Sequence, residues 1–427
     1  MLDEVEQVYR TESGRVLATL IRLLGDFEVA QDALQDAFAA ALVQWPSQGR
    51  PSNPRAWLVG VARHKAIDRL RRAATLRELE PALAVELEGR AVAMEPDVDA
   101  AVPDDLLRLV FTCCHPALNL EAQVALTLHA VCGLPTEAVA RAFLTSTETM
   151  AQRLVRAKRK IRIARIPYQT PGPGDLDARL EGVLAVAYLV YTEGYAGTSG
   201  EQLLSVELCE QAIRLTRALA ELLPERSAIE ALLALMLLHH ARHRARVASN
   251  GDVILLDEQD RRLWDDATIT EGVALVERAL RAPGPVSAYA VQAAIAALHA
   301  RAPSAAETDW RQIVGLYEVL LRLRPTPVVE LNHAVAVAMV DGPARALDLI
   351  DALAARGSLA GYHLLPAARA ELLARLGRSA DAASAYGEAL ALARLGPERR
   401  LLQKRLAAFG SASDVGRPVL SSDILPA

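Results

Sequence analysis

Apolar residues in the first 72 positions recur every three or four residues, which is the spacing of one face of an α-helix. This pattern predicts helices over residues 3–24, 28–43 and 55–72. Gly25 separates the first two, and Asp26 suits the N-cap of the second. The stretch 45–54 is rich in Pro, Ser and Gly, which predicts a loop, with Asn53 and Pro54 opening the third helix.

A second helical block follows an acidic stretch. Residues 73–105 contain nine acidic side chains and two arginines, together with Pro and Gly, so we interpret them as a linker. Helices resume over 106–165, where a short helix at 136–143, a tight turn and a long helix from Thr147 follow one another. This order is typical of a helix-turn-helix motif.

The rest of the chain, from residue 175 onward, is predicted to form pairs of helices. Ala382, Tyr386 and Ala389 have the spacing of a tetratricopeptide repeat, and the pattern recurs one unit upstream from Ala346. The Pro/Gly-rich stretch 166–174 is expected to separate these pairs from the helix-turn-helix. The domain organisation expected from the sequence is therefore 1–72, linker 73–105, 106–165, linker 166–174, helical repeats 175–410 and a tail 411–427.

Composition supports an all-α fold. The 427 residues are 52% hydrophobic but only 4% aromatic, and Ala and Leu, which are strong helix formers, dominate. This excludes an all-β protein. The four cysteines have no regular spacing, which excludes a disulfide scaffold. No signal peptide and no apolar run of about 20 residues is seen, so we expect a cytoplasmic protein without membrane association.

Positive charge is concentrated in two predicted helices. Residues 55–72 contain six basic side chains and one acid, and residues 153–165 contain seven basic side chains and no acid. Such clusters are expected of a nucleic-acid-binding surface, although a solvated face or a partner for the acidic stretch would show the same charge.

Signals for other chemistry are weak. Cys113, Cys114 and His115 are adjacent, so they point in different directions from a helix and do not form a chelating set. His239 and His243 share a helix face, but no carboxylate completes a zinc motif. Glu193 is expected to cap a helix or lie in an interface. We therefore expect no metal, no cofactor and no enzymatic activity.

Two motif blocks resemble a known family. The first runs from Gly25 through Phe38 and continues in Asn53–Leu58 and Val61–Arg72. The second comprises Gly133–Ala140, Ser146–Met150 and Arg153–Lys158. In this order, across an acidic linker, they resemble regions 2 and 4 of extracytoplasmic-function (ECF) sigma factors of the sigma-70 class. The extension resembles that of a subgroup with a C-terminal tetratricopeptide-like domain.

The resemblance implies two partners, RNA polymerase core and promoter DNA. Region 2 would dock on the β′ clamp helices of the polymerase through Asp32, Gln35, Asp36 and Phe38. It would contact the −10 element through Trp57, Arg63, His64, Lys65, Arg69, Arg71 and Arg72. Region 4 would contact the −35 element through Thr147, Thr149, Gln152, Arg153, Arg156, Lys158 and Arg159, with the basic end of this helix on phosphate or on the β flap.

Two alternatives remain open at this stage. A helix-turn-helix regulator with a tetratricopeptide sensor would act without polymerase core, but it would not need region 2. A scaffold with solvated basic helices would not bind DNA. We also expect the net acidic extension to contact region 4 within the chain and to regulate its activity, because the linker between them is short.

Overall fold

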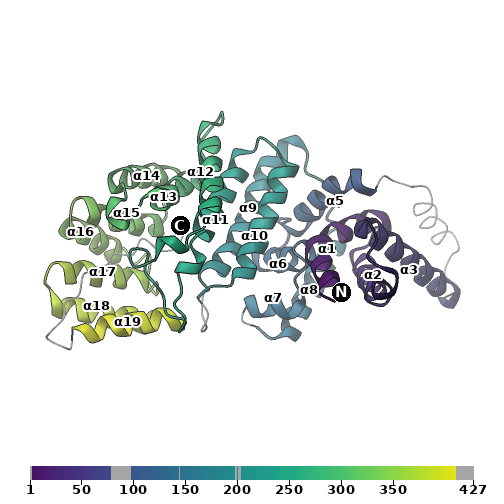
Figure 1. The fold of residues 1–427 in the computed structure, drawn as a ribbon, viewed down its shortest axis with the longest axis horizontal. Helices are drawn as coiled ribbons and strands as arrows, with labels where there is room; N and C mark the ends of the chain where they lie inside the picture. Colours follow the sequence, from purple (N-terminus) through teal and green to yellow (C-terminus); the bar gives the residue numbers. More distant parts are fainter. Residues whose placement is uncertain (1, 78–97, 144, 198–199, 201–202, 410–427) are drawn as a thin grey trace. The chain divides into compact units, whose positions relative to one another are not determined.

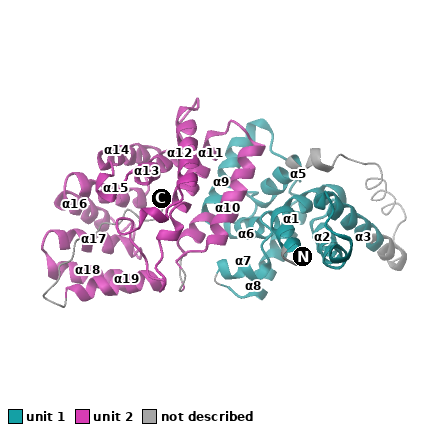
Figure 2. Ribbon diagram, viewed as in Figure 1, with its two compact units in different colours: residues 1–190 teal, residues 191–427 magenta. Residues whose placement is uncertain are grey.

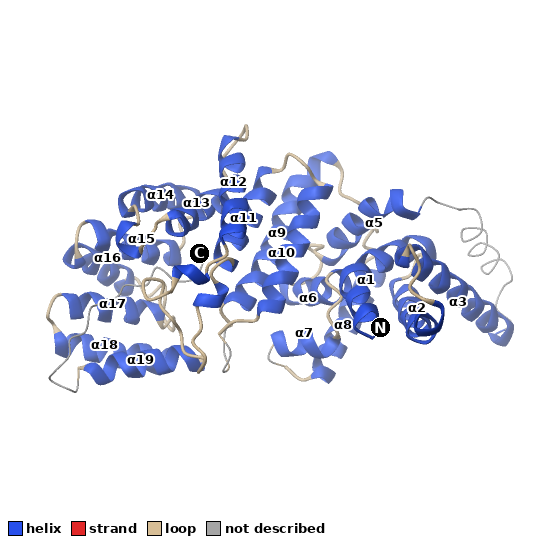
Figure 3. Cartoon of the chain, viewed as in Figure 1, coloured by secondary structure: helices blue, strands red, loops and turns tan. Residues whose placement is uncertain are grey.

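The computed structural model describes residues 2–77, 98–143, 145–197, 200 and 203–409. Every regular element in these residues is a helix (Figure 3), which confirms the predicted all-α class. The chain forms two compact units, residues 1–190 and 191–427 (Figure 2). The division falls inside helix α9 (Pro173–Tyr195), beyond the linker expected at 166–174.

Unit 1 is built around its first helix (Figure 1). Its helices are α1 (Leu2–Leu24), α2 (Phe27–Gln48), α3 (Pro54–Arg77), α5 (Val98–Cys113), α6 (Leu120–Leu126), a π-helical turn (Thr127–Val131), α7 (Thr136–Ala142), α8 (Thr147–Ile163) and most of α9. Helix α1 packs against α2, α3, α5 and the π-helical turn. Its buried Leu17, Leu20 and Ile21 form the centre of this core, so residues on both sides of the acidic stretch share one hydrophobic interior.

The start of α2 agrees with the sequence, but its end does not. The Asp26 carboxylate accepts hydrogen bonds from the backbone N–H groups of Glu28 and Val29, as expected of an N-cap. The helix continues through Pro46 to Gln48, so the loop predicted from residue 45 begins only at Gly49. Trp45 is almost fully buried, and burial of this large ring keeps the last turn helical despite the missing N–H of Pro46.

The acidic stretch expected to be a linker ends inside a helix. Residues 78–97 lie outside the described residues, but α5 starts at Val98 and therefore includes the last eight positions of the stretch. Asp105 is fully buried, and its carboxylate oxygens both accept from Arg22 Nε at 2.8 Å. The end of the stretch is thus part of the unit 1 core rather than a linker.

Unit 2 is a series of helical hairpins. Its helices are α10 (Val206–Leu222), α11 (Ser227–His240), α12 (Asp266–Arg281), α13 (Ala288–Arg301), α14 (Trp310–Leu323), α15 (Pro327–Val340), α16 (Pro343–Ala355), α17 (Leu364–Arg375), α18 (Ser379–Leu392) and α19 (Gly396–Ala408). Short 3₁₀ turns lie at His243–Ala245, Arg261–Leu263 and Ala305–Glu307. From α11 to α18 each helix packs against the next, which is the arrangement of helical repeats.

The two repeats recognised in the sequence correspond to α15–α16 and α17–α18. Ala346 and Ile350 are fully buried in the first repeat, as are Ala382 and Ala389 in the second. Tyr386 is also buried, and its hydroxyl donates to the Glu371 carboxylate at 2.7 Å, which satisfies the polar end of the ring. None of the described helices combines the length and the apolar character needed to cross a bilayer.

Candidate nucleic-acid interface

The outer side of α2 presents two of the four expected docking residues. The Asp32 side chain is 65% exposed, and Gln35 is exposed one turn further on. The Asp36 side chain is only 28% exposed, because its carboxylate pairs with Arg69 at 2.6 Å. Phe38 is buried, with its ring edge-on to Tyr9 at 4.8 Å between centroids. We correct the expected role of Phe38: it supports α2 from beneath and cannot contact a partner.

The exposed side of α2 continues past the residues that sequence reasoning selected. Ala39, Leu42 and Val43 are exposed, and among the described residues Val43, at 75%, is the most accessible large apolar one. Asp32, Gln35, Ala39 and Leu42 follow the three- and four-residue spacing of one helix face. This spacing could have revealed the face, since Leu42 and Val43 lie within the helix predicted over residues 28–43.

The first half of α3 carries one of its expected DNA contacts on the surface. His64 is exposed, and its Nδ1 lies 2.8 Å from the Gly60 carbonyl oxygen. Arg63 is half-buried. Trp57 is also half-buried, and its ring packs edge-on to Trp45 with 5.5 Å between centroids. The Trp57 ring therefore joins α3 to the end of α2.

Two cations in the middle of α3 turn toward α2. Lys65 Nζ donates to the backbone carbonyl of Asp36 at 3.1 Å, and Arg69 pairs with both Asp32 and Asp36. Exposed ion pairs of this kind contribute about 0–1 kcal/mol, so they can exchange for phosphate. The side chains of Arg71 and Arg72, also expected to contact DNA, lie outside the described residues.

The helix-turn-helix predicted from the sequence is formed by α7 and α8. The Ser146 hydroxyl accepts from the Thr149 backbone N–H at 3.2 Å and caps the start of α8. One face of α8 is buried, through Met150, Leu154, Ala157 and Ile161. This apolar face fixes the rotation of the helix, and with it the side chains that point outward.

The outward face of α8 is mainly cationic but also exposes apolar side chains, among them Ile163 at its end. Thr147, Gln152, Arg156 and Arg159 are exposed on it. Val155 is exposed as well, although it was not among the expected contacts. An exposed apolar side chain on a helix in the major groove can contact a thymine methyl group.

The other expected contacts on α8 already have partners within unit 1. The Thr149 hydroxyl accepts from the Ser146 hydroxyl at 2.9 Å, and Arg153 pairs with Glu121 at 3.5 Å. Lys158 Nζ donates to the Gln31 side-chain oxygen of α2 at 2.8 Å. Partial burial there lowers the pKa of Lys158 from its usual value, although nearby Glu28 and Asp32 raise it.

The cysteines of unit 1 are buried thiols. Burial raises the pKa of Cys113 well above its usual value and that of Cys114 to about 11, so both are protonated at neutral pH. Cys114 Sγ lies 3.4 Å from the Thr127 hydroxyl, which suits a packed SH group. In the part of the chain that the structure describes, no cluster of three or more His, Cys, Asp or Glu side chains could hold a metal ion.

Three stretches of the chain match known protein-family models. Residues 8–75 match the family model Sigma-70 region 2, and residues 108–161 match Sigma-70, region 4. Residues 179–280 match a family of unknown function, DUF6596. No solved structure shows a significant match.

Two relatives extend the comparison. An uncharacterized protein, R00370, of Rhizobium meliloti (strain 1021) is 43% identical over 92% of both chains. A probable ECF RNA polymerase sigma factor, SigI, of Mycobacterium tuberculosis is 30% identical over 165 residues, which are 38% of this chain and 56% of SigI. The chain belongs to the ECF class of the sigma-70 family and carries a DUF6596 extension. Members of this family bind RNA polymerase core and promoter DNA.

Proposed function

We propose that this sigma factor binds polymerase core through α2, recognises a −10 element through α3 and a −35 element through α8, and thereby starts DNA-templated transcription. One observation carries the proposal: both sigma-70 regions lie in order on one chain, and each contains a helix with an exposed face suited to its partner. The α2 face is acidic and apolar, as a protein-docking face can be, whereas the α8 face is cationic, as DNA requires.

The test is reconstitution with polymerase core. The full chain, mixed with core, should direct run-off transcription from a subset of fragments in a genomic library, and it should co-purify with core. A helix-turn-helix regulator acting without polymerase would bind fragments but would neither co-purify with core nor change its start sites. That result would replace the proposal with the regulator hypothesis.

Base recognition is proposed for the exposed part of α8. Residues near the N-terminus of a recognition helix reach base edges in the major groove. Arg156 can donate two hydrogen bonds to a guanine and Gln152 can pair with an adenine, each worth about 1–3 kcal/mol of discrimination. Arg159 lies one turn further from the N-terminus, which suits contact with phosphate.

Substituting these two arginines should have different effects. Arg156→Ala should relax preference at one base pair of the −35 element, with a loss of about 1–3 kcal/mol there. Arg159→Ala should weaken binding to all sequences alike and reduce the salt slope by about one ion. Binding measured on a panel of single-base promoter variants at several salt concentrations distinguishes them. Identical behaviour of the two variants would contradict the assignment.

Regulation by the extension is the second part of the proposal. Arg179 is the first residue of the DUF6596 match, and its guanidinium donates to the backbone carbonyl of Phe111 in region 4 at 2.7 Å. The same guanidinium lies 5.9 Å from the centre of the Phe111 ring. This contact supports regulation within the chain, because it ties the start of the extension to a helix of region 4.

Arg179→Ala in the full chain tests this contact. It should lower the unfolding free energy of unit 1 by about 1.5–3 kcal/mol, since a hydrogen bond from a charged group is lost. Run-off transcription should then differ from the unmodified chain, while Glu181→Ala, at an exposed neighbouring position of α9, should change neither quantity. Unaltered transcription by the Arg179 variant would remove the support for regulation through this contact.

A further inference from the structure

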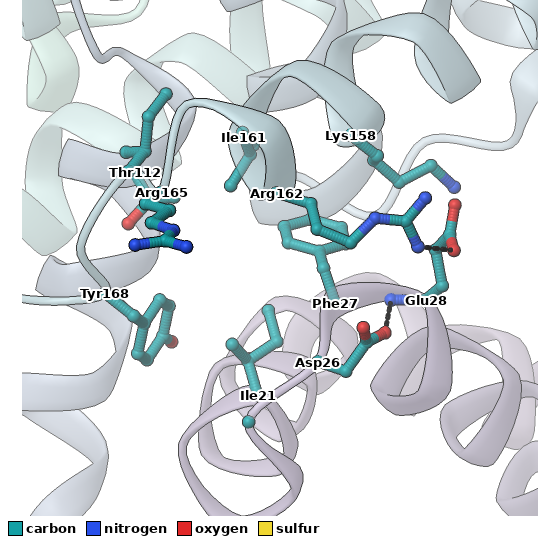
Figure 4. Close-up of a pocket in the computed structure, with 12 residues that line it drawn as sticks. Ile21, Asp26, Phe27, Glu28, Thr112, Lys158, Ile161, Arg162, Arg165 and Tyr168 are labelled. Carbon is teal, nitrogen blue, oxygen red and sulfur yellow. Dashed lines mark hydrogen bonds and ion pairs between the residues drawn. The ribbon is translucent and has the colours of Figure 1, made fainter.

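A cavity of about 360 Å³ lies in unit 1, where the turn between α1 and α2 faces the end of α8 (Figure 4). Ile21 and Phe27 line it from the side of α1 and α2, and Ile161 and Ile166 line it from α8 and the segment that follows. Its volume falls within the range of small-ligand sites, which is about 300–1,000 Å³. At about 30 Å³ per water molecule it would hold roughly twelve waters, so it suits a ligand with a similar number of heavy atoms.

The inner wall of this cavity is apolar. Ile21, Ile161 and Ile166 are buried in the core of unit 1, and none of them is more than 9% exposed. The Tyr168 hydroxyl lies 2.8 and 3.0 Å from two backbone carbonyl oxygens, so this side chain offers the cavity its ring rather than a free donor. A hydrocarbon segment placed against this wall would leave water, which is favourable.

The rim of the cavity is charged, and most of its charged groups are already engaged. The Asp26 carboxylate caps α2, and Glu28 pairs with Arg162 at 3.2 Å. Lys158 Nζ donates to a side-chain amide oxygen of α2 at 2.8 Å. Among the described residues, the guanidinium of Arg165 makes no hydrogen bond or ion pair. Arg165 is therefore the rim cation that is available to an anionic group.

Arg165 also has a backbone conformation that favours glycine. Its φ is 50°, and Glu225 is the only other described residue besides glycine with a positive φ. The Arg165 N–H donates to the Arg162 carbonyl at 3.2 Å, and the Ile166 N–H donates to the Ile161 carbonyl at 3.0 Å. These are the two hydrogen bonds of a Schellman motif, in which this position is usually glycine. The helix thus ends in the expected geometry, but with an unfavourable residue.

The position of the Arg165 side chain offers a reason for this strain. Arg165 lines the cavity, and Figure 4 shows it on one side, with Lys158 and Arg162 on the other. Strained residues of this kind tend to occur at ligand-binding sites, where the side chain has a role that glycine cannot supply. A guanidinium offers two parallel N–H donors, which match the oxygens of a carboxylate or a phosphate.

We propose that this cavity binds a small amphipathic anion, with a carboxylate or phosphate head on Arg165 and an apolar body against Ile21, Phe27 and Ile161. The volume suits a body of about eight to ten carbon atoms. The inference does not depend on the proposed function, because it concerns binding of a small molecule to the full chain.

Titration calorimetry with a series of ligands tests the chemical class. Affinity of the full chain should rise about three- to fourfold for each added CH₂ group from butyrate to octanoate, because each group is buried against the apolar wall. Octanol and octylamine, which lack the negative head, should bind about tenfold more weakly or not at all. Octanoate and octyl phosphate distinguish the two head groups. Failure of both to bind at millimolar concentration, or an equal affinity for octylamine, would overturn the proposal.

Arg165→Gly separates binding from folding. Glycine suits the positive φ, so the variant should unfold at the same temperature as the unmodified chain or a higher one. Its affinity for octanoate should nevertheless fall about tenfold or more, because a charge-assisted hydrogen bond is lost. Arg141→Ala is the control, since it removes an exposed cation of α7 that does not line the cavity. Equal octanoate affinity in the two variants would mean that the anion does not bind at Arg165.

Methyl NMR of the full chain locates the ligand independently. With labelled isoleucine methyl groups, octanoate should shift the signals of Ile21, Ile161 and Ile166, which line the cavity. The signals of Ile213 and Ile229, buried in unit 2, should stay unchanged. Shifts confined to isoleucines outside the cavity would overturn the proposal.

Discussion

Replacing Asp32 and Gln35 together with arginine should reduce binding to polymerase core by about 100-fold or more. Both side chains are exposed on the outer face of α2. Because charges across an interface are complementary, the Asp32 carboxylate is expected to face a basic surface of the partner. Two added positive charges would place like charges opposite each other, which costs several kcal/mol at a desolvated contact. Fluorescence titration of labelled full-length protein with core measures the change.

A matched control is available in the same region. Glu4 and Gln7 of α1 are also an exposed acid and an exposed amide three positions apart. Glu4→Arg with Gln7→Arg changes the net charge of the protein by the same amount on another face of region 2. Equal losses in the two double variants would show a general charge effect, and no loss at Asp32 and Gln35 would mean that α2 is not the docking helix.

The second large effect is expected at Asp105. Asp105→Asn should lower the unfolding free energy of unit 1 by about 3–5 kcal/mol, because it leaves the guanidinium of Arg22, only 16% exposed, without its counter-charge. Asp104→Asn, at the neighbouring exposed position, should stay within about 0.5 kcal/mol of the unmodified chain. Urea unfolding of the full chain, followed by a probe in unit 1, measures both.

The pKa of Asp105 adds a pH dependence to the stability of unit 1. Burial raises the pKa of the carboxyl group, and the opposing effects of Arg22 and Arg108 do not cancel it. A raised folded pKa means that the folded state holds this proton more tightly, so the contribution of the group to stability falls as pH rises from the unfolded value of 3.8 through the folded value. A similar unfolding free energy for the Asp104→Asn and Asp105→Asn variants would contradict this account.

Local features of the chain were predictable because they depend on neighbours in sequence. The spacing of apolar residues predicted α1, α2 and α3, and the short polar side chains Asp26 and Asn53 marked two helix starts. The family resemblance rested on the same kind of information, since its motifs are short runs within single helices.

The tertiary structure decided which of the candidate side chains are available. Phe38 and Asp36 lie on one helix only two positions apart, yet the first is buried against Tyr9 and the second pairs with Arg69 of another helix. The burial of Trp45 likewise extended α2 through a proline that, read locally, predicted a loop. Periodicity identifies a buried face, but it does not say how wide that face is or what packs on it.

The contacts between regions 2 and 4 could not be predicted from the sequence. Arg22 and Asp105 are 83 positions apart, and Lys158 and Arg162 meet residues 127 and 134 positions away. Each pair depends on how α5 and α8 pack against α1 and α2, and local spacing contains no information about that packing. The sequence by itself therefore determined the helices, their order and the family. Only the tertiary structure decided that the two regions meet, because packing brings together side chains that the chain keeps far apart.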